Sequence, residues 1–221
     1  MDASFLDALG PEVRADVQRL GIVRQHRRGT FLMLEGDRND HVLLVRQGRI
    51  KIVGTADDGQ ELLLAVRGPG ELVGELNALA GSDAPRAASA VALDDVTVQS
   101  IAGVEFLAFL GRYPELSLAL LRNLARRLRE ATARHAEAGG YDVLHRVTRM
   151  LVDQAQRQGR PVDGGLLVSE GLSQADLAGL VAASQKSVAR ALAVLRSRGL
   201  ITTGRRSIVV CDLPGLRRFA R

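Results

Sequence analysis

Two short segments, Gly70-Glu71-Leu72-Val73-Gly74-Glu75-Leu76 and Pro85-Arg86-Ala87-Ala88-Ser89, decide the interpretation of this chain. Glycine lets backbone N–H groups approach an anion closely, and an arginine offers paired donors to phosphate oxygens. Glu75 adds a carboxylate that can accept a hydrogen bond from a ribose hydroxyl. The set therefore suits a cyclic sugar phosphate. The alternative is that the glycines only connect strands and that Glu75 and Arg86 form a solvated ion pair.

The residues around these segments predict a β-barrel. Between His26 and about Ile101, short β-prone runs alternate with turns that contain glycine, which is typical of an antiparallel sandwich or barrel. The predicted strands are Phe31–Leu34, Val42–Val45, Ile50–Val53, Leu62–Val66, Ala88–Leu93 and Val96–Ile101. A short helical section over residues 5–20 precedes them, and Glu75–Leu79 is predicted as a short helix within the barrel.

A long helix follows the barrel. Pro114 suits its first turn, and apolar residues then recur in steps of three and four, as in a coiled-coil seam. The pattern predicts a homodimer, with Leu121, Leu124, Leu128 and His135 in the interface. Leu116 and Leu120 lie on another face, which could pack on the barrel. The alternative is an amphipathic helix that covers only its own domain. Gly139-Gly140 interrupts the helix as a hinge.

Two capped helices separated by a tight turn form a helix-turn-helix pattern near the C-terminal end. They are Gln174–Val181, capped by Ser173, and a second helix that begins after Ser184 and ends near Gly199. A basic hairpin around Gly204-Arg205-Arg206 follows as a wing. Side chains of the second helix can reach base edges, and the hairpin arginines can reach phosphates. The predicted DNA-binding residues are Ser173, Ser184, Gln185, Lys186, Arg190, Arg205 and Arg206. The alternative is an ordinary helical hairpin with a solvated basic face.

The charge distribution agrees with a polyanionic partner for the C-terminal part. The 221-residue chain carries a net charge of +5, and residues 141–221 hold 13 basic against 6 acidic residues. The N-terminal part is close to neutral in net charge, whereas the C-terminal part is strongly basic. This difference favours a nucleic acid as the partner of the C-terminal part. The sequence predicts three domains: a sensor over 1–113, a dimerisation helix and hinge over 114–140, and a winged-helix domain over 141–221.

Other function classes find little support in the sequence. The single cysteine, Cys211, excludes a disulfide framework, and the four histidines lack the spacing of metal ligands. We therefore expect no metal and no bound cofactor. No catalytic nucleophile–base set is recognisable, so we expect no enzyme. No apolar run approaches a membrane span and no signal segment begins the chain, which predicts a cytoplasmic protein without membrane contact.

The motifs together resemble the catabolite-activator (CRP/FNR) family of bacterial transcription regulators over nearly the whole chain. Gly-Glu-Leu followed by Pro-Arg-Ala-Ala is similar to the phosphate-binding cassette of cyclic-nucleotide-binding domains. The resemblance implies an α+β fold with a jelly-roll-like barrel, a long dimerisation helix and a winged helix-turn-helix. It implies cyclic AMP as the allosteric effector, double-stranded DNA and a second copy of the chain as partners, and contact with RNA polymerase. The implied effector-binding residues are Gly74, Glu75, Leu76, Arg86, Ala87 and Thr132, the last from the partner subunit.

Three departures from the catabolite activator keep alternatives open. Ala87 stands where it has a serine, and Ala131 where it has the first of two hydroxyl residues near adenine. Gln185-Lys186 replaces an Arg-Glu pair in the reader helix. Pro-Arg-Ala-Ala nevertheless resembles the cassette of protein kinase A regulatory subunits, which bind cyclic AMP. The alternatives are a regulator of the same family with another effector or none, and a cyclic-nucleotide-binding regulatory or scaffold protein.

Overall fold

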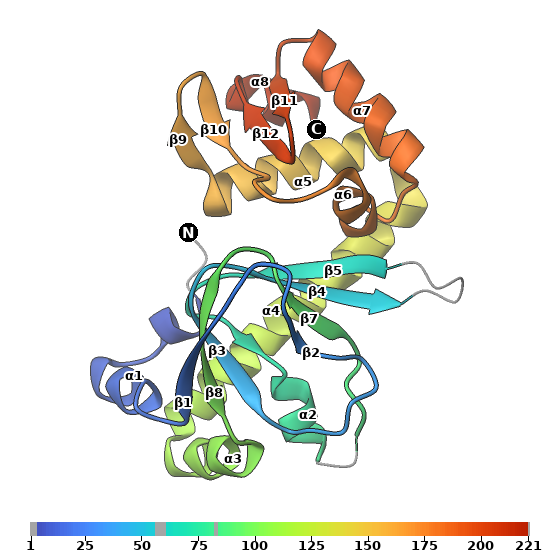
Figure 1. Cartoon of the computed structure of the whole chain (residues 1–221). Helices are drawn as coiled ribbons and strands as arrows, with labels where there is room; N and C mark the ends of the chain where they lie inside the picture. Colours follow the sequence, from blue (N-terminus) through green and yellow to red (C-terminus); the bar gives the residue numbers. More distant parts are fainter. Residues whose placement is uncertain (1–3, 56–60, 82–83, 221) are drawn as a thin grey trace. The chain divides into compact units, whose positions relative to one another are not determined.

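A computed structural model describes residues 4–55, 61–81 and 84–220, with the side chains of 134–139 and 158 outside the described part. The chain divides into two compact units, and the boundary lies inside a long helix, α4 (Pro114–Gly140). The first unit ends at Leu128 and the second begins at Arg129. The predicted dimerisation helix is thus shared between the units, which we describe one at a time (Figure 1).

The first unit is a barrel of two four-stranded antiparallel sheets, with strand orders β1-β8-β3-β6 and β2-β7-β4-β5. Its strands are β1 (Ile22–His26), β2 (Phe31–Met33), β3 (Val42–Gln47), β4 (Ile50–Thr55), β5 (Glu61–Arg67), β6 (Leu72–Val73), β7 (Ser89–Ala92) and β8 (Val96–Ile101). Apolar side chains from both sheets, such as Val45 and Ile50, form a common buried cluster between them. The six predicted strands are therefore confirmed to within a few residues, because alternating apolar residues fill this interior.

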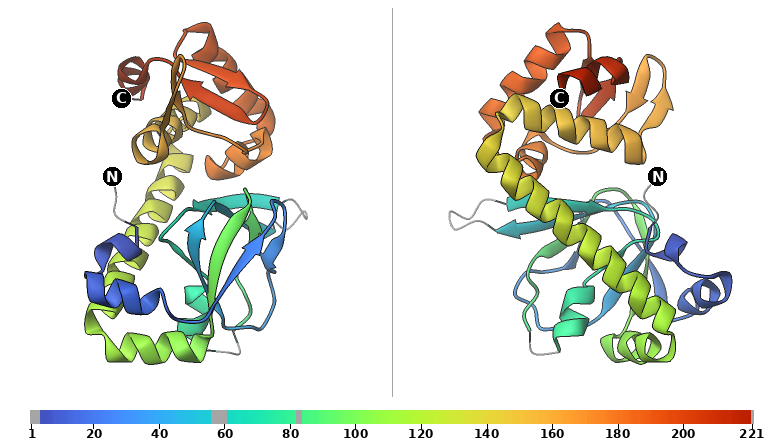
Figure 2. Two further views of the ribbon diagram at one scale, coloured as in Figure 1. Left: turned by 60° about the vertical axis from the view of Figure 1, so that its left-hand side comes forward. Right: turned by 180° about the vertical axis from the view of Figure 1, so that it is seen from behind.

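Helices close one side of the barrel. They are the 3₁₀ turn η1 (Leu6–Ala8), α1 (Pro11–Val17), α2 (Glu75–Ala80), α3 (Gly103–Arg112) and the first half of α4. Leu116 and Leu120 of α4 are buried in a second cluster that also holds Val13 of α1 and Phe106 of α3. The prediction that this face of α4 packs on the barrel is confirmed, and Figure 2 shows this half of the helix along the back of the barrel.

The sequence pattern does not predict three elements of this unit. Strand β1 is exposed along almost its whole length, so its residues show no buried–exposed alternation. Strand β6 has only two residues. Helix α3 buries Gly103, Phe106 and Leu110 at helical spacing. The sequence prediction misses this helix, because it passes directly from the last strand to the helix that begins at Pro114.

The second unit is a winged helix-turn-helix domain. It contains α5 (Val143–Gln158), β9 (Arg160–Val162), β10 (Gly165–Leu167), α6 (Gln174–Leu180), α7 (Gln185–Ser197), β11 (Ile201–Gly204), β12 (Ser207–Val210) and α8 (Leu213–Phe219). The strands form one sheet in the order β11-β12-β10-β9. Asp142, Ser173 and Ser184 each cap the helix that follows them. The sequence also predicts α5, over Val143–Gln156, and β10, over Leu166–Val168, but it does not predict β9 or α8.

The sequence predicts that Gly139-Gly140 interrupts the long helix, and this prediction is wrong. Helix α4 continues through Gly139 and ends at Gly140, so the glycines form its last turn. Among the described residues, no helix is both long and apolar enough to cross a membrane.

Candidate anion-binding cassette and DNA interface

The cassette begins where β6 meets α2. Gly74 is the N-cap of α2 and has a left-handed backbone, φ +88°. A Cβ atom at this position would collide with Nη1 of Arg86 and with the side chain of Met33. Position 74 therefore requires glycine for two reasons: the left-handed backbone conformation and the close approach of the arginine. The predicted pairing of Gly74 with Arg86 in one site is present in the structure.

Arg86 is almost completely buried and donates to three acceptors. Its Nη1 donates to Gly74 O at 3.0 Å, and its Nη2 donates to His41 O at 2.6 Å. Nε and Nη2 both donate to Oδ1 of Asn39, at 2.9 and 2.6 Å. Burial lowers the pKa of Arg86 from its ordinary value, while the carboxylates of Asp40 and Asp37 raise it. A guanidinium remains protonated under such shifts, so a positive charge is held inside the cassette.

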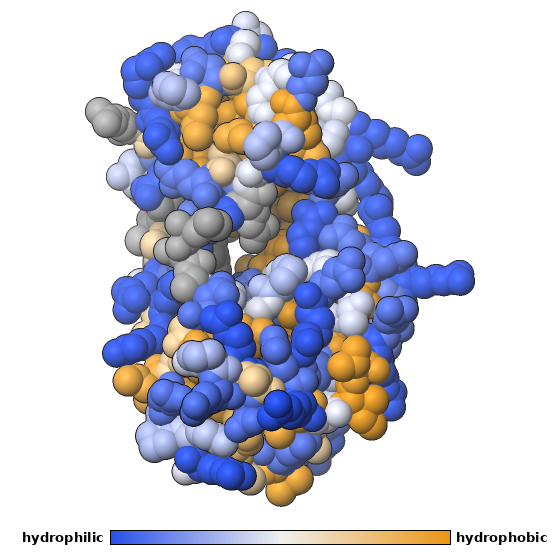
Figure 3. All heavy atoms as spheres, turned by 90° about the vertical axis from the view of Figure 1, so that its left-hand side faces the viewer, coloured by the Kyte–Doolittle hydropathy of each residue, from blue (hydrophilic) through white to orange (hydrophobic). Residues whose placement is uncertain are grey.

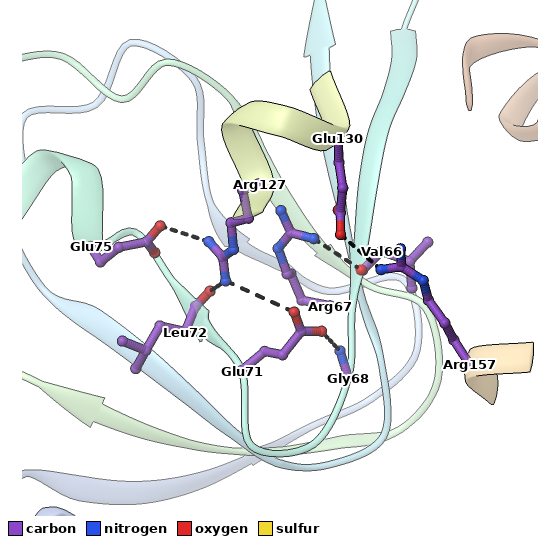
Figure 4. A network of polar contacts seen from close by, with 9 residues as sticks. All are labelled: Val66, Arg67, Gly68, Glu71, Leu72, Glu75, Arg127, Glu130 and Arg157. Atoms are coloured by element: carbon purple, nitrogen blue, oxygen red, sulfur yellow. Dashed lines mark hydrogen bonds and ion pairs between the residues drawn. The ribbon is translucent and has the colours of Figure 1, made fainter. Parts of the chain in front are cut away.

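Glu75 is also buried, at 3% exposure, but its partner is not Arg86. Its Oε1 accepts from Nη1 of Arg127 on α4 at 2.7 Å, and Nη2 of Arg127 donates to Leu72 O at 2.9 Å (Figure 4). Oε2 of Glu75 has no hydrogen-bond partner among the described residues. The solvated Glu75–Arg86 ion pair of the alternative interpretation is thus absent from the described part, and Glu75 keeps one free acceptor.

Arg127 is the main residue of this site that the sequence pattern does not assign. The periodicity of α4 places it only outside the apolar seam, among several arginines. Figure 4 shows its guanidinium between Glu75 and Glu71, whose Oε1 lies 4.0 Å from Nη2 of Arg127. The Gly-Glu-Leu segment could have indicated such a residue, because a carboxylate that becomes buried requires a cationic partner.

The other predicted effector-binding residues are exposed. Leu76 on α2 is 56% exposed, and Ala87 beside Arg86 is also exposed. Thr132 is exposed on the part of α4 that belongs to the second unit. The structure therefore brings together Gly74, Glu75 and Arg86. Thr132 was expected from the partner subunit, so its role stays a prediction.

The predicted interface residues of α4 point in different directions. Leu121 and Leu128 are 63% and 68% exposed, and their heptad spacing puts both on the same face of the helix. Leu124 is instead partly buried and packs on the core of its own unit. The side chain of His135 lies outside the described residues.

Elsewhere, hydrophilic side chains cover most of the face seen in Figure 3, and apolar ones form small groups.

The reader helix has the predicted two faces. Val188, Ala191, Leu192 and Leu195 are buried in the second unit. Gln185, Lys186 and Arg190 are exposed on the other face, where Nη2 of Arg190 lies within 3.3 Å of Ser187 Oγ. The hydroxyls of Ser173 and Ser184 accept from backbone N–H groups as helix caps, so their first role is to fix where α6 and α7 begin.

The turn between α6 and α7 and the wing both contain a left-handed residue that is not glycine. Ala182 has φ +48°, and Nη1 of Arg146 donates to the backbone oxygens of Val181 and Ala182 at 2.7 and 3.0 Å. In the wing, Arg206 has φ +54°, and both Arg205 and Arg206 are exposed at the hairpin tip. Two exposed arginines at a hairpin tip are suited to contact backbone phosphates.

The fold and site define a class of protein: a sensor barrel with a buried cationic cassette, followed by a winged helix-turn-helix with an exposed polar and basic reader. Comparisons agree with this class. Residues 23–113 match the cyclic nucleotide-binding domain, and residues 145–219 match the Crp-like helix-turn-helix domain.

Relatives over most of the chain support the same assignment. The CRP-like cAMP-activated global transcriptional regulator of Mycobacterium tuberculosis is 36% identical over 194 residues, 88% of this chain and 86% of the relative. The cyclic AMP receptor protein of Thermus thermophilus is 32% identical and covers 89% of this chain and 87% of the relative. The solved c-di-GMP responsive regulator CLP of Xanthomonas campestris shares the fold, with a TM-score of 0.79, 22% identity and 92% and 100% coverage of the two chains.

The chain belongs to the CRP/FNR family of transcription regulators. It is thereby a DNA-binding regulator with a cyclic-nucleotide-binding domain rather than an enzyme.

Proposed function

We propose that this protein is a homodimeric transcription regulator whose effector is cyclic AMP and whose cassette residues are Gly74, Glu75 and Arg86. The regulators of M. tuberculosis and T. thermophilus that it resembles are both named for cyclic AMP. In this proposal Arg86 binds the cyclic phosphate, and the free Oε2 of Glu75 accepts from the ribose hydroxyl.

The unpaired oxygen of Glu75 is the observation that supports this assignment most. A buried acceptor without a partner costs free energy, and a ligand hydroxyl would remove that cost. The positive charge of Arg86 lies beside Gly74, with Nη1 3.0 Å from Gly74 O, where an anionic group would compensate it. A sugar phosphate carries both groups, a hydroxyl donor and an anion, at a short fixed separation.

Dimerisation and DNA reading complete the proposed function. The exposed leucines of α4 supply an apolar stripe for a second copy of the chain. Two reader helices would then enter successive major grooves of double-stranded DNA, with Gln185, Lys186 and Arg190 toward the bases and Arg205 and Arg206 toward phosphates. Effector binding would shift the population of dimers toward the DNA-competent arrangement. We assign the protein to the cytoplasm, where it would act with RNA polymerase.

Calorimetric titration of the nucleotide-stripped protein tests the proposal. We expect cyclic AMP to bind, more tightly than cyclic GMP, and to increase affinity for a palindromic DNA duplex. Arg86→Ala should weaken cyclic AMP by about 10-fold or more, because a charge-assisted hydrogen bond contributes about 1.5–3 kcal/mol. The exposed Arg28→Ala is the matched control.

Two results would replace this function by an alternative. DNA binding that ignores both nucleotides would indicate a regulator with another effector or none. Cyclic AMP binding without any salt-dependent DNA complex would indicate a regulatory or scaffold protein.

A further inference from the structure

We propose that Asn39 is the positioning residue of Arg86: its carboxamide oxygen orients the guanidinium so that the Nη1 edge is presented to the cassette at Gly74. This inference rests on the proposed cyclic-nucleotide function, since it names the residue that prepares the phosphate-binding group of that site. Asn39 lies outside both cassette segments, in the loop between β2 and β3.

The first argument is the geometry of the guanidinium. Asn39 Oδ1 accepts from Nε at 2.9 Å and from Nη2 at 2.6 Å, so one acceptor binds one whole edge of the group. Nη2 donates its second hydrogen to His41 O. Only Nη1 faces Gly74, with one hydrogen on Gly74 O at 3.0 Å. An arginine has five N–H donors, and four are engaged by these contacts, which leaves one on Nη1 for a ligand.

The second argument is that the whole loop is folded around Arg86. Its backbone N–H donates to Asp37 O at 2.8 Å, and its backbone oxygen accepts from Gly36 N at 2.9 Å. The backbone N–H and C=O of Arg86 are thus bound to Asp37 and Gly36, and its side chain is bound to Asn39 and His41. A group held at this many points loses little conformational entropy when a ligand binds, which favours affinity.

The third argument concerns charge. Asn39 is neutral, so it binds the guanidinium without cancelling the charge that a phosphate needs. Burial lowers the pKa of Arg86, and Asp40 and Asp37 raise it through space, but neither carboxylate accepts a hydrogen bond from the guanidinium, whose acceptors are Asn39 Oδ1, Gly74 O and His41 O. Nδ2 of Asn39 lies 3.5 Å from Oδ2 of Asp37, which turns the amide oxygen toward Arg86. An aspartate at position 39 would make a bidentate ion pair and compete with the phosphate.

The test measures Arg86 orientation without any ligand. A hydrogen-bonded, buried Nε–H exchanges slowly enough to give a proton–nitrogen NMR signal, which we expect in the wild type and which Arg86→Lys assigns by removing it. Asn39→Ala should abolish or strongly shift this signal, and the neighbouring exposed Arg38→Ala should leave it in place. An unchanged Nε–H signal in a folded Asn39→Ala protein would overturn the proposal.

The second measurement is a double-mutant cycle in cyclic AMP affinity. We expect Asn39→Ala to weaken binding about 10-fold, but by less than 2-fold when Arg86 is already alanine, because Asn39 acts only through Arg86. Equal losses in both backgrounds would contradict a positioning role and indicate general damage to the barrel.

Asn39→Asp separates orientation from charge. It should rescue the Nε–H signal while binding cyclic AMP more weakly than the wild type, with a difference that shrinks at high salt. An aspartate that binds as tightly as asparagine would overturn the argument from charge. A wild-type protein that binds no cyclic nucleotide would refute the proposed function, and the Nε–H signal would then decide alone whether Asn39 orients Arg86.

Discussion

Nη1 of Arg127 lies 2.7 Å from Oε1 of Glu75, and the two side chains are only 15% and 4% exposed. The pair joins the first turn of α2, which begins the cassette, to the middle of α4. Arg127 also donates to Leu72 O, at the first residue of β6. One arginine on the long helix therefore fixes both the carboxylate and the backbone of the site.

Breaking this pair from one side should be costly. Arg127→Ala leaves the Glu75 carboxylate buried without a cation, and we expect a loss of about 3–5 kcal/mol in the free energy of unfolding. Because Glu75→Gln removes the unpaired charge, adding it to Arg127→Ala should recover part of that loss. Urea unfolding of the four proteins checks this, with the exposed Arg122→Ala as control. Strictly additive losses would show that the two side chains do not interact.

How much of this site could be predicted depends on sequence distance. The cassette residues Gly74, Glu75 and Arg86 are recognisable because the glycines, the carboxylate and the arginine occur in two short segments that are close in the sequence. Arg127 and Asn39 reach the same site from α4 and from the β2–β3 loop, and no local pattern links them to it. Leu124 shows the related limit of periodicity: it keeps the seam spacing, but its side chain packs on its own unit.

The same contrast holds for the fold. Reader helix α7 was predictable because four buried residues repeat at helical spacing on a capped segment. Strand β1 was not, since it is held by backbone pairing with β8 while its side chains stay exposed. Backbone hydrogen bonds leave no pattern of apolar residues.

The sensor unit should lose stability in mild acid through His41. Burial, and then the charge of Arg86, lower the pKa of His41 from its ordinary value of 6.5. The unfolded chain therefore binds more protons than the folded one, and stability is full above pH 6.5 and falls as the pH drops toward the folded pKa. We expect the urea midpoint to decrease between pH 7.5 and 5.5, and His41→Gln to flatten this dependence. A slope that persists unchanged in His41→Gln would assign it to other groups; His26→Gln controls for the loss of an imidazole.

The exposed leucines of α4 should hold the dimer. Replacing Leu121 and Leu128 by lysine removes two apolar side chains from the proposed interface, and each buried leucine contributes about 1.5–3 kcal/mol. Sedimentation should then show a monomer that no longer binds DNA. Leu124 is left intact because it packs on its own unit. Val104→Lys, a 74% exposed site on α3, is the control, and a double variant that remains dimeric would place the interface elsewhere.

Ala182→Gly should stabilise the second unit. Ala182 adopts φ +48° in the turn between α6 and α7, a conformation that costs an L-residue about 1–2 kcal/mol and glycine almost nothing. Part of that gain is lost to the greater freedom of glycine in the unfolded chain, so we expect a net increase of about 0.5–1 kcal/mol. Thermal unfolding measures it. Ala183→Gly, next to it but without a positive φ, should destabilise, and an equal effect at both positions would contradict the strain argument.

The operator should be a palindrome with half-sites about one helical turn, ~34 Å, apart, because each protomer of a symmetric dimer places its own α7 in a major groove. Its half-site should differ from that of the catabolite activator at the base read by Lys186. An ammonium only donates, so it cannot accept from the cytosine amino group as a glutamate does, and it should select guanine or bind a phosphate. Arg190 should favour guanine at its own position.

Selection of binding sites from a random DNA pool, with wild type and Lys186→Glu in parallel, tests this reading. The glutamate variant should acquire a preference for cytosine at one position of each half-site and keep the others, because only one reader side chain has changed from donor to acceptor. Lys186 is exposed in the first turn of α7, so the substitution changes no packed contact. If the wild type already demands cytosine there, or if the variant changes no position, Lys186 does not contact a base and the register of the reader helix must be reassigned.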